Sequence, residues 1–348
     1  MKKRASLILI MPVIAALITC AHTGQYNKKD YEKILAGNLD LKGLNLRYSN
    51  LKGITLNAAD LRKTDFTGAD LRDAKISDSD LSGSIFGNAD CSGIEISGCN
   101  VSRCDFKGAK AKKSIIKNSN LSGSDLRQSD FRESSLNDSD LRETTLYGAN
   151  LSNSSIIKID FSNADLMRAD FTGSDMSKCR FIDTYAGGAF MSRTKLDESD
   201  LTSADFFGAD LSSSSFKGVI IDGTKLYNTN LKRSNLSGLI INQAELSGAD
   251  LGGANLNEAM LNDSNLMGAI LNYANLNKSA LKRSNLRGAD LTEANLFYAN
   301  LEEADLTSAI LQRVNIRGAF LKGAKISRRY QNLIQVQNAS HPSINWVD

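Results

Sequence analysis

The chain has 348 residues, a formal net charge of +3 and an ordinary hydrophobic content of 41%, yet it contains only 2 Pro, 1 Trp and 2 His against 26 Gly. This length can bury a sizeable core, but the composition argues against an ordinary globular domain. Because Ser, Asn and Asp are so abundant, the apolar residues must be placed by a regular pattern.

Residues 1–20 have the three parts of an export signal. A basic start precedes an apolar run of 12 residues, 7–18, and the segment ends at Cys20. Twelve apolar residues are typical of a signal-peptide core, whereas a membrane span needs about 20. The ending Leu-Ile-Thr-Cys resembles a bacterial lipobox, which implies lipidation of Cys20. Thr19 departs from the residues preferred there, so two alternatives stay open: secretion after cleavage behind Ala21, and an uncleaved apolar start.

Residues 21–38 are expected to form a linker and an N-terminal capping helix. Tyr31, Ile34 and Leu35 lie at helical spacing, and Gly37 follows as a stop signal. Such a helix would cover the open end of the region that follows.

A five-residue repeat fills residues 39–326. Large apolar residues recur at every fifth position from Leu41 onwards, 58 times without an insertion or deletion, and Cys91, Ala111 and Ala186 are the weakest members. A small residue usually lies two positions earlier, and in extended backbone both side chains face the same way. Only a coil that turns a corner once per five residues keeps every such pair inside, which predicts a solenoid.

The motif Ala-(Asp/Asn)-Leu-X-X, as in AADLRKTDFTGADL at residues 58–71, resembles the pentapeptide repeat family. The resemblance covers residues 39–326. It implies an all-β solenoid, a right-handed quadrilateral β-helix with four pentapeptides in each coil and therefore about 14 coils with short helical caps. At a strand spacing of ~4.8 Å the rod is roughly 70 Å long.

Four cysteines fall in register with this repeat. Cys91 occupies a large apolar position, whereas Cys99, Cys104 and Cys179 occupy the small inward position. Because a buried cysteine packs as a small hydrophobe, we interpret these thiols as core residues rather than as redox or metal-binding groups.

Residues 327–348 are expected to form a C-terminal cap and tail. Tyr330, Leu333 and Ile334 lie on one helical stripe, whereas Trp346 falls in a segment predicted to be irregular. In some members of the resembled family a C-terminal element mediates dimerisation, so the resemblance raises a homodimer through this end.

The sequence offers no support for catalysis. His22 lies beside the processing site, His341 lies in the tail, and the carboxylates follow the repeat rather than forming a separate cluster. Neither a phosphate-binding loop nor a metal-ligand spacing is present. We therefore expect a non-enzymatic protein with no catalytic residues, no metal and no cofactor.

The best-known members of the resembled family protect DNA gyrase by mimicking DNA with an acidic rod. Residues 31–326 carry 35 basic against 37 acidic side chains, a balance that does not imitate a polyanion. We expect no nucleic-acid partner, and we keep a gyrase-protecting, topoisomerase-binding protein as the alternative function.

Basic side chains gather on two successive coils. This basic patch has two interpretations, a solvated charged face or a contact with anionic lipid or polysaccharide. Its members are Lys107, Lys110, Lys112, Lys113, Arg127 and Arg132.

A second candidate site is a strip of outward aromatic and apolar side chains on stacked coils. Within the segment TYAGGAF, Tyr185 and Phe190 replace the usual Asp or Asn, and the position after the central residue is large and apolar in neighbouring coils. Such an aromatic strip either binds a protein or glycan or merely stabilises the rod by stacking. The strip consists of Tyr147, Met167, Tyr185, Phe190, Phe207 and Tyr227.

Two neighbouring coils depart from the repeat on another face. Val219 and Leu239 are oversized for the small inward position, and Ile220 and Ile240 point outward. This face is expected to bulge or to be covered.

These patterns together predict a non-enzymatic bacterial envelope lipoprotein. Its membrane attachment is the lipid at Cys20, on the outer membrane or the periplasmic face. Its rigid rod is a scaffold that binds an envelope protein or polysaccharide.

Overall fold

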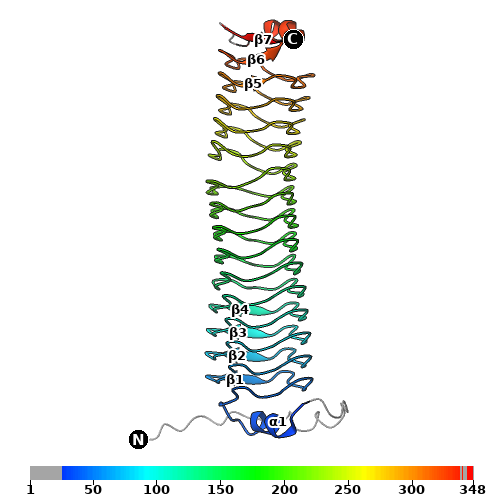
Figure 1. The fold of residues 1–348 in the computed structure, drawn as a ribbon, viewed down its shortest axis with the longest axis vertical. Helices are drawn as coiled ribbons and strands as arrows, with labels where there is room; N and C mark the ends of the chain where they lie inside the picture. The colour runs from blue at the N-terminus through cyan, green and yellow to red at the C-terminus, as the bar shows by residue number, and fades with distance from the viewer. Residues whose placement is uncertain (1–25, 338, 340–342, 348) are drawn as a thin grey trace, which may run out of the picture.

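The computed structural model describes residues 26–337, 339 and 343–347. They form a β-solenoid of about 14 coils, a right-handed quadrilateral β-helix, with α1 at one end of a long rod and β7 at the other (Figure 1). This confirms the fold class predicted from the five-residue repeat.

Regular elements are short because each side of a coil holds only a few extended residues before the next corner. Two parallel sheets result, with the strand orders β1-β2-β3-β4 and β5-β6-β7. The elements in chain order are α1 (Lys28–Leu35), β1 (Thr55–Asn57), β2 (Lys75–Ser77), β3 (Glu95–Ser97), β4 (Ile115–Lys117), β5 (Asp305–Leu306), β6 (Lys325–Ser327), the 3-10 helix η1 (Arg328–Tyr330), α2 (Gln331–Val336) and β7 (Asn345–Val347).

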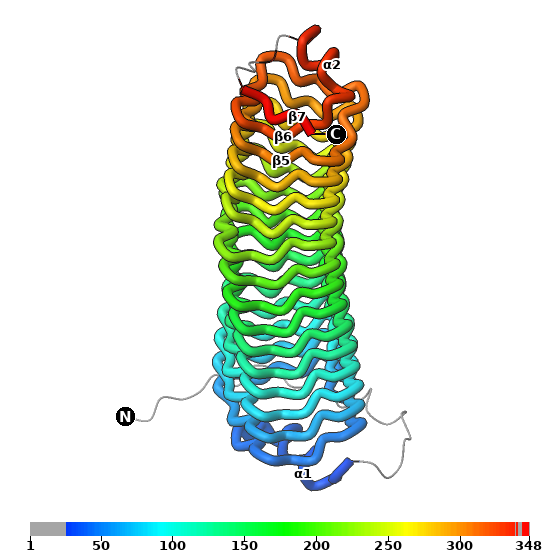
Figure 2. The backbone as a smooth tube through the Cα atoms, turned by 45° about the horizontal axis from the view of Figure 1, so that its top comes forward, coloured from blue at the N-terminus to red at the C-terminus, as the bar shows by residue number. Residues whose placement is uncertain are grey.

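Each coil contains 20 residues. Parallel bridges join residues 20 apart along the rod, as in Asp165 with Tyr185 and Tyr185 with Asp205, and the stacked coils are visible in Figure 2. Leu56 lies opposite Ile76 with the same offset where β1 pairs with β2. Outward columns of side chains can therefore be read from the sequence in steps of 20.

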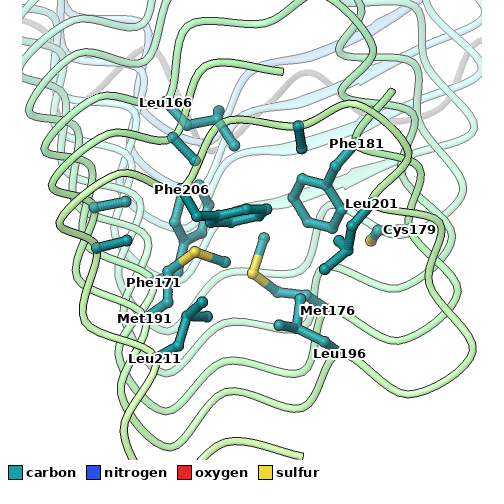
Figure 3. Packing of buried hydrophobic residues seen from close by; sticks show 14 of the residues in the cluster. Leu166, Phe171, Met176, Cys179, Phe181, Met191, Leu196, Leu201, Phe206 and Leu211 are labelled. Carbon is teal, nitrogen blue, oxygen red and sulfur yellow. The ribbon is translucent and has the colours of Figure 1, made fainter. Parts of the chain in front are cut away.

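Central and small inward side chains fill the interior. The rings of Phe66, Phe86 and Phe106 stack on successive coils with centroids 5.0 and 4.5 Å apart. Figure 3 shows how residues such as Phe181 and Phe206 point from neighbouring coils into the common core. Ala186 is also fully buried, so TYAGGAF continues the repeat without a break.

The helix α1 closes the first coil. Ile34 is buried, and the Tyr31 hydroxyl donates a hydrogen bond to the Asn50 carbonyl oxygen at 2.9 Å. Leu35 lies on the predicted helical stripe but is exposed. A helix of about two turns therefore covers this end with one buried side chain.

At the opposite end, η1 and α2 satisfy backbone donors of the last coils. The Tyr330 hydroxyl accepts the Leu311 amide at 3.0 Å, and the Gln337 side-chain oxygen accepts the Ile316 amide at 2.8 Å. Ile334 is fully buried beneath them.

The prediction of an irregular tail was wrong at Trp346. This residue lies in β7, which pairs in parallel with β6 and places Trp346 opposite Ile326. The last coil exposes an unpaired ladder edge, and the end of the chain supplies the strand that covers it.

The backbone hydrogen bonds that join stacked coils are interrupted between the coils that contain Ile220 and Ile240, and we call this interruption the seam. Within the described residues no bridge joins these two isoleucines, and no backbone hydrogen bond links the Ile221 amide to Ile240. Ile220 and Ile240 are 56% and 65% exposed. The face therefore bulges, as the sequence suggested.

Stacked bulky residues explain the seam. Val219 and Leu239 occupy the small inward position in consecutive coils, so two large side chains compete for the same interior space. Ile94 also fills this position, but Ala74 and Ser114 lie above and below it, and the ladder there is intact.

We expect the Ile221 amide to exchange with solvent at least about tenfold faster than the Ile241 amide, because unpaired backbone donors open most readily. Ile241 is the matched control, since it lies one coil away in the same column and donates to the Met260 carbonyl at 2.8 Å. Hydrogen exchange followed by NMR or mass spectrometry measures both. Equal protection of the two amides would show that the seam is closed in solution.

Candidate binding surface

Where an outward Asp or Asn precedes the central residue, its side chain closes a tight local turn. The Asp165 carboxylate accepts the Met167 amide at 3.0 Å, and Asp205 accepts the Phe207 amide at 3.0 Å. This hydrogen bond from a backbone amide to the Asp or Asn side chain two residues earlier satisfies a donor that does not bond to the neighbouring coil. Because donor and acceptor belong to the same coil, the bond stabilises that coil on its own.

Tyr185 and Phe190 interrupt this pattern. Each lies in a column whose neighbours one coil above and below are aspartates, and an aromatic ring cannot accept the amide hydrogen as a carboxylate does. No described residue accepts the Gly187 or Ser192 amide in its place. The two rings are 60% and 53% exposed, so the rod loses a turn contact and gains exposed apolar surface.

The rest of the strip forms a straight column beside Tyr185. Tyr147, Met167 and Phe207 are exposed and Tyr227 is half-buried. The Phe207 and Tyr227 rings lie 4.8 Å apart at an interplanar angle of 33°. Phe190 lies on the next face, beyond a corner, so the strip covers one face and reaches round its edge.

Sequence reasoning missed three exposed tyrosines at corners, Tyr48, Tyr273 and Tyr298, where the backbone has φ of 53°, 59° and 54°. The Tyr298 ring lies over Gly318, whose missing side chain leaves room for it. For Tyr48 and Tyr298 the available signal was an aromatic corner residue followed one coil later by Gly, but Tyr273 has Glu293 at that place. Packing within the chain accounts for Tyr298.

Ion pairs neutralise most of the basic patch. The Arg127 guanidinium, hydrogen-bonded to Asp125, lowers the pKa of that carboxyl. Only Lys107 and Lys110 of the patch form no salt bridge with another described residue. The paired members are Lys112 and Lys113 with Glu133, Arg127 with Asp125, and Arg132 with Asp130.

Cys20 lies outside the described residues, so lipidation at this position stays a prediction. Of the helices that the structure describes, none is long and apolar enough to span a membrane. In the same part of the chain, no group of three or more His, Cys, Asp or Glu side chains is arranged to hold a metal ion.

The four cysteines of the rod are free and buried. The Cys104 thiol donates to the Leu81 carbonyl at 3.0 Å, much as the Ser84 hydroxyl donates to Leu61 at 2.6 Å. Burial raises the pKa of Cys104 and of Cys179 to about 12. All four thiols are therefore core residues, as the register predicted, and Cys104 takes the place of a small inward serine.

We expect none of these four thiols to react with a thiol reagent at pH 8 in the folded Cys20→Ala chain, and all four to react after unfolding, because the thiolate is the nucleophile. The unfolded thiols lose protons above about pH 8.5 while the folded ones keep them, so stability falls as the pH rises through that value. Thiol counting and urea unfolding from pH 7 to 10 test this. Rapid labelling of the folded chain would contradict it.

Comparisons with known proteins agree with the fold. The family model "Pentapeptide repeats (8 copies)" matches residues 40–78, 74–110, 174–212, 214–253, 249–288 and 289–328, and "Pentapeptide repeat region" matches residues 94–171. No curated protein sequence matches the chain.

Several solved structures are similar. HetL, a pentapeptide repeat protein involved in heterocyst differentiation regulation in the cyanobacterium Nostoc sp. strain PCC 7120, is 29% identical over 62% of this chain and 89% of its own, with a TM-score of 0.39. Full-length QnrB1, a plasmid-mediated fluoroquinolone resistance protein, is 18% identical over 82% and 97%, with a TM-score of 0.29. A protein of the Arabidopsis thaliana thylakoid lumen is 21% identical over 36% and 62%, with a TM-score of 0.19. Because the repeat model covers more than half of its residues, the chain belongs to the pentapeptide repeat family.

Proposed function

We propose that this chain is an exported, lipid-anchored rod of the bacterial envelope, a non-enzymatic scaffold that binds a protein through its aromatic strip. The observation that carries the proposal is the replacement of turn-closing aspartates by Tyr185 and Phe190. Each replacement forgoes a hydrogen bond that contributes about 1 kcal/mol. Aromatic rings placed at a cost to the fold are best explained by contacts outside the chain.

The geometry of the strip favours a protein partner over a glycan. A sugar ring stacks on the face of an aromatic ring, but the Phe207 and Tyr227 rings pack against each other, with centroids 4.8 Å apart and planes inclined by 33°, which leaves less of each face free. Their edges, together with the flexible thioether of Met167, form an apolar ridge instead. Aromatic and methionine side chains of this kind are enriched at protein interfaces.

The use of the carboxylates supports a scaffold rather than an enzyme. Asp205 accepts the Phe207 amide and lies 3.5 Å from the Lys225 ammonium, and Asp125 is held by Arg127. Carboxylates engaged in this way stabilise turns and are not poised for proton transfer. Pentapeptide repeat β-helices are in general non-catalytic scaffolds.

The N-terminal sequence supports export. The basic start, the 12-residue apolar run and Cys20 are arranged as in a lipoprotein signal. A single acyl chain gives only marginal membrane binding, so stable anchoring of this chain requires a second chain or another membrane contact beside it.

Cell fractionation of the natural chain and of Cys20→Ala tests the location. We expect the natural chain in the membrane fraction, with an N-terminal peptide whose mass corresponds to acylated Cys20, and the variant without that modification. Unprocessed, unlipidated protein in the cytosol would instead favour the alternative, a topoisomerase-binding protein.

Affinity capture from envelope extract tests the strip. The triple variant Tyr147→Ser, Phe207→Ser and Tyr227→Ser is expected to lose the captured protein while its circular dichroism stays that of the β-helix. The matched control is Ile220→Ser with Ile240→Ser, which removes exposed apolar side chains from a different face. Unchanged capture by the triple variant would show that the strip is structural.

A further inference from the structure

The order of side-chain types in the main column of the aromatic strip is almost the same from either end of the rod. Tyrosines lie two coils from the centre on either side, large apolar side chains lie one coil away, and the centre itself is a glycine. The neighbouring outward column has the same symmetry about Tyr185, with an aspartate one coil away on each side. The main column consists of Tyr147, Met167, Gly187, Phe207 and Tyr227.

Gly187 is not required by the fold of its own chain. Gly188 beside it turns a corner with φ of +63°, but Gly187 does not adopt a left-handed conformation. A Cβ atom at Gly187 would lie 3.7 Å from the Phe207 carbonyl oxygen and 3.9 Å from Met167 Cγ, which are ordinary contact distances. Gly187 lies at the first position of a turn, where neighbouring coils of the strip carry large side chains, so its missing side chain leaves an open place that another chain can approach.

We infer that the protein bound by the strip is a second copy of this chain, packed antiparallel about a two-fold axis beside Gly187. The inference rests on the proposed function of the strip and names its partner. A half-turn about an axis perpendicular to the rod exchanges coils equally far from Gly187, as an isologous interface requires. Tyr147 of one copy then lies opposite Tyr227 of the other, and Met167 lies opposite Phe207.

The missing side chain of Gly187 leaves a gap in the strip, which we call the notch. The notch receives a side chain from the other copy. Tyr185 is the most exposed aromatic residue of the strip, and the half-turn brings the two Tyr185 side chains together at the axis. Each ring can lie over the Gly187 backbone of the opposite copy, where no side chain obstructs it.

The position of the axis also gives the largest overlap of the two rods. The repeat runs from residue 41 to 326, so its midpoint lies near residue 184, in the same coil as Gly187. Two antiparallel rods therefore end flush with each other. A face ~10 Å wide and ~70 Å long provides on the order of 700 Å² of contact per copy, close to the roughly 800 Å² of a standard interface.

Acidic side chains that flank the strip meet across this interface, and cations of their own copy offset part of their charge. Asp165 lies opposite Asp205 of the other copy, whose partner Lys225 at 3.5 Å supplies the compensating charge. At each end of the strip, Arg127 lies opposite Ser247 of the other copy, and Asp125 lies opposite Glu245. The Arg127 guanidinium is paired with Asp125 of its own copy and offsets the negative charge there.

Sedimentation of the detergent-solubilised chain measures the association. We expect a dimer whose dissociation constant rises at least about tenfold in Gly187→Arg, which fills the notch at a position where a Cβ fits. Ser192→Arg, in the same coil on the next face, is expected to dimerise normally, and circular dichroism verifies both folds. A monomeric natural chain, or a Gly187→Arg variant that dimerises as tightly as the natural chain, overturns the inference.

Disulfide cross-linking in a Cys20→Ala background tests the orientation, because the other thiols are buried. Gly187→Cys is expected to cross-link to itself, and Arg127→Cys is expected to cross-link to Ser247→Cys when the two chains are mixed. Ser247→Cys alone cross-links only in a parallel pair, and that result contradicts the antiparallel arrangement.

The two proposals fail in different ways. A monomeric chain that still captures another envelope protein through the strip overturns the homodimer and leaves the proposed function standing. A chain whose strip mediates neither capture nor dimerisation overturns both.

Discussion

Replacing Phe206 by alanine is expected to lower the free energy of unfolding by about 3–5 kcal/mol, the usual loss for a phenylalanine deleted from a packed core. The Phe206 ring is fully buried, and its centroid lies 6.2 Å from that of Phe181 in an edge-on contact (Figure 3). Four fixed sides of backbone surround the cavity, so the coil cannot collapse to fill it.

The adjacent residue provides the control. Phe207 is the next residue in the chain but points outward, so Phe207→Ala removes the ring contact with Tyr227 and costs less than about 1.5 kcal/mol. Urea unfolding of the two variants under conditions where both are monomeric measures the difference. Similar losses from the two substitutions would mean that the alternation of inward and outward residues is wrong at this coil.

Removal of residues 328–348 is expected to destabilise the rod by at least about 3 kcal/mol and to cause end-to-end self-association. Truncation leaves the Leu311 and Ile316 amides without their acceptors on Tyr330 and Gln337. It also exposes the edge of β6 that β7 covers. An uncapped solenoid end is a template for another chain.

Light scattering and urea unfolding test the cap. The matched control is Val336→Ser, because Val336 is in α2 but points into solvent, and we expect it to match the natural chain. A truncated chain with the size and the unfolding midpoint of the full-length protein would show that the cap contributes nothing.

The sequence alone was sufficient to predict which residues of the rod face inward and which face outward. A strict five-residue period determines which side chains are inside, so the burial of Ala186 and of Cys104 followed from counting alone. The open seam was also visible in advance, because two oversized residues, Val219 and Leu239, are one coil apart.

Features that depend on the ends of the rod or on exposed side chains were harder to predict. Trp346 has no periodic neighbours in the sequence, and its pairing with Ile326 depends on the edge that the last coil leaves open. From helical spacing alone, Leu35 was predicted to lie on the face of α1 that covers the first coil. In the structure Ile34 is the buried residue of this helix. The packing of the core does not constrain which side chains point outward. The sequence therefore indicated the aromatic strip but not what the strip contacts.

The central claim is that the strip serves a partner at a cost to the fold, and Tyr185→Asp tests it most directly. The aspartate restores the carboxylate found at Asp165 and Asp205, where it accepts the amide two residues later at 3.0 Å. Measured by urea unfolding at a concentration where the chain is monomeric, the variant is predicted to be more stable than the natural chain by about 0.5–1.5 kcal/mol. A less stable variant would contradict the claim, because Tyr185 would then be stabilising its own rod.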